Sequence, residues 1–217
     1  MSNAADYPTD IRPLAKAIAE HLDGFEVKAL PNGWDKDAEK TRARLVHKDG
    51  RVIGLILGTT RYGRAPEGKL HVYGEYGTDN GQPVQPQEVG AIRYNESAPA
   101  INISAKKSPN RIAREIERRF LGEYTPIWQY CQEKICQYAE QREVVARRAE
   151  EIRLALGLEP PSVRLNYDKS QATIYLPYRE DRRGSIEVGP TWVSFDLSTG
   201  PDAGLSLAKA IAGLTRE

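Results

Sequence analysis

The sequence predicts an α+β protein, in which two lobes built on antiparallel sheets are joined by one long helix. Three observations predict this fold. Short strand-like segments separated by turn residues occur on both sides of residues 125–156. Residues 125–156 themselves carry apolar side chains at helical spacing. The hexapeptide Leu-Ala-Lys-Ala-Ile-Ala occurs at 14–19 and again at 207–212. The expected organisation is a first lobe over 8–123, a connecting helix over 124–157 and a second lobe over 158–217.

Composition is that of a globular protein without membrane spans. The 217 residues are 40% hydrophobic and 28% charged, with 31 Lys and Arg against 30 Asp and Glu. A disordered chain would be poorer in apolar residues and farther from neutrality. No run approaches the roughly 18 apolar residues of a membrane-spanning helix, and no secretory signal is recognisable at the start. We therefore expect the cytoplasm of the source cell, or of the host cell if the gene is viral.

The first lobe is expected to begin with a helix capped by Thr9 or Asp10, followed by antiparallel strands. The apolar stripe of that helix is predicted to be Leu14, Ala17, Ile18, His21 and Leu22. Strands are expected at 25–30, 41–48, 51–60, 69–76 and 101–103, and Asp49-Gly50 is typical of a two-residue hairpin turn. Residues 78–91, rich in Gly, Pro, Gln and Asn, are expected to form a long loop.

Two helices follow, and the second is expected to carry an interface. Ser108-Pro109 predicts a helix start, Leu121-Gly122 a break, and Thr125-Pro126 the start of a helix reaching Leu156. Either the two lobes or a second copy of the chain must cover its apolar seam. We expect a homodimer, although Arg142 interrupts the seam. The predicted interface comprises Cys131, Ile135, Tyr138, Val145, Ala149 and Ile152. Both cysteines are expected to be reduced.

The second lobe repeats the order of elements in the first. Gly157 and Pro160-Pro161 end the long helix. Strands are expected at 163–167, 172–178, 185–188 and 192–197, and a last helix at 205–214. Each half is then a helix, about four strands and a helix. This order indicates either a duplicated unit or a coincidence of common sequence patterns.

The sequence offers little support for catalysis. The spaced motifs of phosphate-binding loops, dinucleotide-binding folds, zinc proteases, serine hydrolases and Cys-x-x-Cys pairs do not occur. His47 and His71 have no evident third metal ligand. A metal-dependent nuclease is kept as an alternative, on Glu67 and Lys69 with Asp49, or on Glu26 and Lys28 with a preceding acid. No catalytic residue, cofactor or metal is otherwise expected.

A basic and aromatic segment gives the more coherent indication. Residues 41–76 contain seven Lys or Arg against three acids, with tyrosines among them. Such a sheet face can contact phosphates and stack on bases, although the solvated face of any one-sided sheet has a similar composition. The leading prediction is a non-enzymatic protein that binds a nucleic acid or nucleoprotein complex, and a protein–protein interaction module is the alternative. The predicted binding residues are Arg42, Arg44, Lys48, Arg61, Tyr62, Arg64, Lys69 and Tyr73.

A short segment carries a family resemblance. Ile103-Ser104, followed by Pro109 to Phe120 (PNRIAREIERRF), resembles a stretch in uncharacterised accessory proteins of bacterial phages and integrative elements. The resemblance covers under a tenth of the chain and brings no functional residues with it. It implies an accessory or anti-defence factor of a mobile element, acting by binding.

Overall fold

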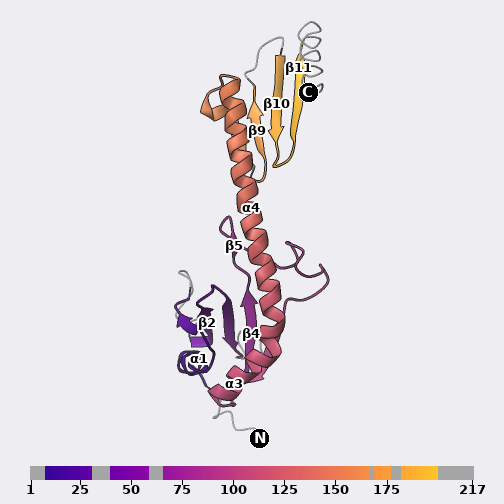
Figure 1. Cartoon of the computed structure of the whole chain (residues 1–217). Coiled ribbons are helices and arrows are strands. Elements are labelled where there is room, and N and C mark those ends of the chain that lie inside the picture. Colours follow the sequence, from indigo (N-terminus) through magenta and orange to yellow (C-terminus); the bar gives the residue numbers. More distant parts are fainter. Residues whose placement is uncertain (1–7, 31–39, 59–65, 167–168, 177–181, 200–217) are drawn as a thin grey trace. The chain divides into compact units, whose positions relative to one another are not determined.

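The computed structural model confirms the α+β class, with a five-stranded sheet, a long helix and a four-stranded sheet (Figure 1). It describes residues 8–30, 40–58, 66–166, 169–176 and 182–199. The expected last helix and three predicted binding residues, Arg61, Tyr62 and Arg64, lie outside these ranges. The chain divides into two compact units, unit 1 (residues 1–135) and unit 2 (residues 136–217), and the division falls within the long helix.

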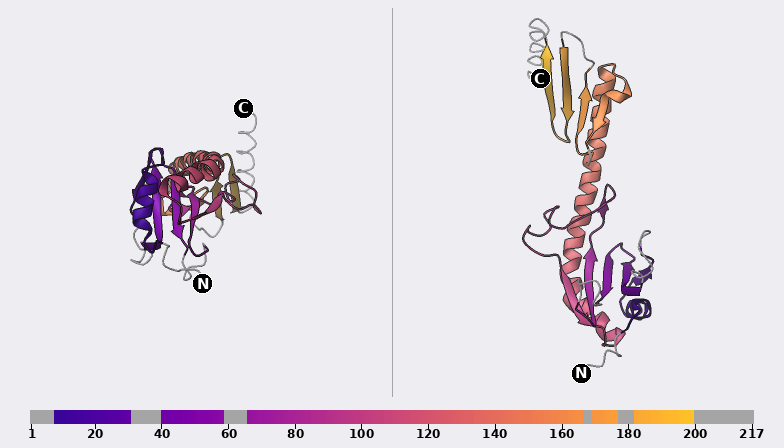
Figure 2. Two further views of the ribbon diagram at one scale, coloured as in Figure 1. Left: turned by 90° about the horizontal axis from the view of Figure 1, so that it is seen from below. Right: turned by 180° about the vertical axis from the view of Figure 1, so that it is seen from behind.

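Unit 1 contains an antiparallel sheet in the order β1-β2-β3-β4-β7. Its strands are β1 (Phe25–Lys28), β2 (Arg42–His47), β3 (Val52–Leu57), β4 (Lys69–Glu75) and β7 (Ala100–Ser104). Alternate side chains face the core, so Leu45, Ile53, Leu70 and Val72 are completely buried. Helix α1 (Ile11–Ala19) packs on β1, β2 and helix α3 (Pro109–Ile116). Figure 2 shows these helices on one side of the sheet. No described helix covers the opposite face, which carries Arg42, Arg44 and Tyr73 and which we call the open face.

Helix α1 is capped as expected but faces the core with a different stripe. The Asp10 side chain accepts a hydrogen bond from the Arg12 N–H at 2.9 Å. The buried positions are Ile11, Ala15, Ile18 and Leu22. The predicted stripe was wrong at His21, which is exposed. A stripe with spacings of four, three and four starting at Ile11 leaves His21 a quarter-turn outside the core.

The segment predicted as a long loop contains a small hairpin. Strands β5 (Thr78–Asp79) and β6 (Gln82–Pro83) pair across Asn80 and Gly81. Both residues have positive φ, 48° and 80°, as a two-residue hairpin turn requires, and Asn-Gly is the sequence that favours this geometry. The long loop expected over 78–91 therefore contains one short paired segment.

The predicted helix break at Leu121-Gly122 was also wrong. Helix α3 continues through a π-helical turn (Glu117–Leu121) into α4 (Gly122–Ala155), and Pro126 lies inside α4. Phe120 and Tyr124 are completely buried and their rings stack at 5.1 Å between centroids. Proline costs the helix one backbone hydrogen bond, and the burial of these two aromatic rings offsets that local cost.

Unit 2 contains an antiparallel sheet in the order β11-β10-β9-β8. The strands are β8 (Val163–Leu165), β9 (Ala172–Tyr175), β10 (Arg182–Val188) and β11 (Val193–Thr199), preceded by a 3-10 turn (Pro160–Ser162). Helix α4 ends before Gly157, whose φ is 61°, as predicted. The described core consists of Val145 and Ala149 from α4 with Ala172, Ile174, Ile186 and Val188 from the sheet.

The apolar seam of α4 is covered by the chain's own sheets. Cys131 and Ile135 pack into the core of unit 1, whereas Val145, Ala149 and Ile152 pack into that of unit 2. Tyr138 is half-buried. Of the two coverings considered for the seam, the lobes of the same chain therefore account for these five predicted interface residues. None of the helices in the described ranges has the length and apolarity to cross a membrane.

Candidate nucleic-acid interface

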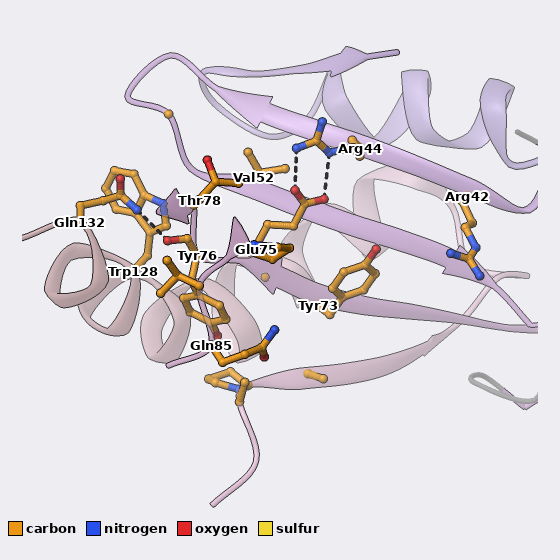
Figure 3. A pocket seen from close by; sticks show the side chains of 18 of the residues that line it. Arg42, Arg44, Val52, Tyr73, Glu75, Tyr76, Thr78, Gln85, Trp128 and Gln132 are labelled. Carbon is orange, nitrogen blue, oxygen red and sulfur yellow. Dashed lines mark hydrogen bonds and ion pairs between the residues drawn. The ribbon is translucent and has the colours of Figure 1, made fainter. Parts of the chain in front are cut away.

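A cleft of about 760 Å³ lies on the open face of the unit 1 sheet. Its floor is formed by β2, β3 and β4, and its walls by the β5–β6 hairpin, residues 83–85, residues 98–100 and the first half of α4. This volume falls in the range of small-molecule pockets. We call it the open-face cleft, and its most informative lining residues are Arg42, Arg44, Tyr73, Glu75, Trp128 and Gln132 (Figure 3).

The floor of the open-face cleft is an aromatic ring laid over a glycine. Gly54 pairs with Tyr73 across β3 and β4. A Cβ on Gly54 would lie 2.1 Å from the Tyr73 ring, so any side chain at position 54 would displace the ring. His71, two residues earlier on the same face, stacks on Tyr73 with centroids 5.9 Å apart. The Nδ1 of His71 lies 3.0 Å from Oδ1 of Asn102 on β7.

A bidentate ion pair crosses the cleft above β3. Arg44 donates from Nε to Glu75 Oε1 at 2.8 Å and from Nη2 to Oε2 at 2.5 Å. Both side chains are half-buried, at 24% and 32% exposure. Figure 3 shows Tyr73 between this pair and Arg42, which lies farther along the floor. Of the two arginines that line the cleft, Arg44 is therefore the one whose bonds to Glu75 are described.

Helix α4 closes one end of the cleft because Tyr124 anchors it to the sheet. The Tyr124 hydroxyl accepts from the Val52 N–H at 3.1 Å and lies 3.0 and 2.9 Å from the carbonyl oxygens of Val52 and Glu75. Its ring occupies the space that a side chain at Gly74 would fill. One turn and two turns later, Trp128 and Gln132 reach the cleft, and Gln132 Nε2 donates to the Tyr76 carbonyl at 2.8 Å.

The structure brings part of the predicted binding set together. Arg42, Arg44 and Tyr73 line the cleft. Lys69 is exposed on the same face of β4, four residues before Tyr73, whereas Lys48 is exposed beyond the end of β2. The sequence-based set omitted Glu75, which shares the alternating face with Lys69 and Tyr73. It also omitted Trp128 and Gln132, which lie on the expected long helix and reach the cleft only through the packing of that helix on the sheet.

Ion pairs offset several of the cations in and around the basic segment. Arg44 is paired with Glu75, and Lys28 lies 2.6 Å from Glu26. Arg51 Nε lies 2.9 Å from Asp49 Oδ2, and His47 Nδ1 lies 2.6 Å from Oδ1. Burial disfavours the charged form of Asp49, but its hydrogen bonds to the Arg51 N–H and to His47, with the Arg51 charge, outweigh this and lower its pKa.

The residues of the nuclease alternative are not gathered. Asp49 precedes β3 and Glu67 precedes β4, and the ladder pairs Val52 with Glu75 and Leu57 with Leu70, so these acids lie at opposite ends. Glu26 is paired with Lys28. His47 contacts Gly24 and Phe25, whereas His71 is on the open face. Within the described ranges no three His, Cys, Asp or Glu side chains form a metal-binding group.

No family model, curated protein or solved structure matches this chain.

Proposed function

We propose that this chain is a non-enzymatic binding protein that engages single-stranded nucleic acid, free or within a nucleoprotein complex, in the open-face cleft. The observation that carries the proposal is the Tyr73 ring, which lies over Gly54 in a cleft that Arg42 also lines. Aromatic rings on such faces stack on bases without sequence preference, while neighbouring cations contact phosphates.

A single strand fits this geometry better than a duplex. The bases of a duplex are stacked on one another and cannot reach a ring at the floor of a walled cleft, whereas an unpaired base can. Trp128 at the end of the cleft offers a second aromatic surface near the floor. On the short resemblance to phage and integrative-element proteins, we propose that this binding takes place in the cytoplasm of an infected or element-bearing bacterium.

Anisotropy titration of labelled single-stranded oligonucleotides tests the proposal. Base stacking is worth about 1–3 kcal/mol per base, so Tyr73→Ala should weaken binding by roughly 5- to 150-fold. Arg42→Ala should reduce the dependence of log K on log salt concentration by about one phosphate contact. Arg93→Ala is the matched control, because its side chain is 85% exposed and lies outside the cleft lining. Equal affinities for all three variants and the wild type would refute the proposal.

The homodimer remains a prediction, but the apolar seam that suggested it no longer requires a second copy of the chain. Its seam residues pack against the sheets of the same chain. Light scattering at tens of micromolar decides the question, since a mass near the 24.3 kDa of one chain excludes the dimer.

A further inference from the structure

An acidic side chain lies at the centre of a cleft that we propose for a polyanion. Glu75 is on the same sheet face as Tyr73, two residues along β4, and lines the open-face cleft. A carboxylate repels a phosphate bound nearby, and the negative charge of Glu75 also offsets the positive charge of Arg44. Glu75 therefore requires an explanation if the cleft binds nucleic acid.

The ion pair fixes the carboxylate without using all of its acceptor capacity. Each oxygen of Glu75 accepts one hydrogen bond from Arg44. An ionised carboxylate has about four acceptor positions, so each oxygen can accept a further bond from a ligand. The bidentate geometry holds the two oxygens in one orientation, which is the preorganisation that a specificity contact needs.

The two ends of the floor thus favour different parts of a nucleotide. Arg42 lies on the far side of Tyr73 from Glu75 (Figure 3). A phosphate is attracted toward Arg42 and repelled by Glu75, so a base stacked on Tyr73 presents its polar edge to the carboxylate. On that edge cytosine carries the N4 amine, a donor, where thymine carries the O4 carbonyl, an acceptor.

Resting on the proposed function, we infer that Glu75 makes the cleft selective for bases with an exocyclic amine at this edge, cytosine over thymine, at the position stacked on Tyr73. Glu75 acts as an acceptor for the amine and as a repulsive group for the carbonyl oxygen. Selectivity arises from one charged acceptor, so it is expected at a single nucleotide position of the bound strand.

The experiment compares short oligo-dC and oligo-dT, which are both pyrimidine strands, in anisotropy titrations at fixed salt. Wild-type protein should bind oligo-dC at least about 10-fold more tightly, as expected for one hydrogen bond to a charged group. In Glu75→Gln both affinities should rise, because a negative charge is removed, and the ratio should fall toward one, because the amide can donate or accept.

Glu26→Gln is the matched control. Glu26 is an ion-paired acid on β1 that is absent from the cleft lining, and its substitution removes the same charge from unit 1. It should leave the dC/dT ratio at its wild-type value. Circular dichroism of both variants checks that the fold is retained.

The failures of the two proposals are distinguishable. Wild-type protein that binds neither oligonucleotide overturns the proposed function and this inference with it. Binding of both with equal affinity, or a dC/dT ratio unchanged in Glu75→Gln, overturns the role of Glu75 and leaves nucleic-acid binding in place.

Discussion

Unit 1 and unit 2 share one plan, an antiparallel sheet with helices against one face, but they differ in how much of that face the described helices bury. In unit 1, α1, α3 and α4 together cover the sheet, with Phe120 and Tyr124 at the centre of the core. In unit 2, α4 contributes Val145 and Ala149, and the described core is entirely aliphatic. Phe195 and Val193 of β11 remain 55% and 40% exposed.

This difference has a consequence for where a binding site can form. The open-face cleft needs a rigid floor, and the Gly54, Gly74 and Tyr124 contacts supply one by fixing β3, β4 and α4 together. In unit 2, α4 packs on the described strands through small aliphatic side chains, and Arg148 donates a hydrogen bond to the Pro190 carbonyl at 2.6 Å. Unit 1 is therefore the better scaffold for positioned side chains.

The largest expected effect comes from the core anchors of each unit. Phe120→Ala should destabilise unit 1 by about 3–5 kcal/mol, and Ile174→Ala should destabilise unit 2 by about 2–5 kcal/mol. Hydrogen exchange read by mass spectrometry should show faster exchange in β3 and β4 for the first variant, and in β9 and β10 for the second. Faster exchange in both units with either variant would show that the units do not unfold separately.

The reactivities of the two cysteines allow a comparison of unit 1 with unit 2, because one cysteine lies on each side of the division. Cys131 is completely buried in unit 1, and burial raises its pKa to about 11, whereas Cys136 is exposed at the start of unit 2. Alkylation with iodoacetamide should modify Cys136 roughly 100-fold faster than Cys131, whose modification requires local opening. Peptide mass spectrometry measures both rates. In Phe120→Ala, Cys131 should become reactive while the rate at Cys136 stays constant.

Two neighbouring tyrosines separate anchoring from simple burial. Burial raises the pKa of both hydroxyls, but Tyr124 bonds to the backbone of β3 and β4, whereas the buried hydroxyl of Tyr76 has no hydrogen-bond partner among the described residues. Tyr124→Phe should lower the free energy of unfolding by about 1–3 kcal/mol. Tyr76→Phe should change it by less than about 0.5 kcal/mol or raise it.

Urea unfolding followed by circular dichroism gives both values for the tyrosine variants. Equal losses from the two substitutions would mean that the Tyr124 hydrogen bonds do not hold α4 to the sheet. The wall of the cleft formed by α4 would then not be anchored to the sheet by Tyr124.

Local sequence patterns predicted the individual helices and strands better than they predicted the contacts between them. The Asp10 cap depends on neighbouring residues and was among the predictions, whereas the Asn80-Gly81 hairpin depends on neighbouring residues too but was not among the expected strands. The continuity of the helix through Gly122 and Pro126 was not predicted either, because the burial of Phe120 and Tyr124 against distant strands decides it. Gly122 and Pro126 are therefore weaker signals of a helix end than their local propensities indicate.

The candidate site depends even more on contacts between distant residues, which local sequence patterns do not predict. Alternation placed Arg42, Arg44 and Tyr73 on one face, and the structure agrees. The pairing of Arg44 with Glu75, 31 residues apart, depends on which strands are neighbours, as does the closing of the cleft by Trp128. The number of Lys and Arg residues in 41–76 does not indicate which of them form ion pairs. In the structure, Arg44 pairs with Glu75 and Arg51 pairs with Asp49.

The smallest expected effect concerns α1, the helix that unit 1 has in addition to α3 and α4. The side-chain hydrogen bond from Arg12 holds the pKa of Asp10 at about 2, below its ordinary value of 3.8. Because the folded-state pKa is the lower one, ionised Asp10 stabilises unit 1 above about pH 4, and this contribution is lost as the pH falls through about 2. Asp10→Asn keeps a capping side chain and removes only the charge, so its deficit relative to wild type should be well below the 0.5–2 kcal/mol typical of losing a cap. Thermal unfolding of both proteins should show the deficit at pH 7 and a smaller one at pH 2.5. A deficit that is constant with pH would mean that the Asp10–Arg12 pair does not contribute to the stability of unit 1.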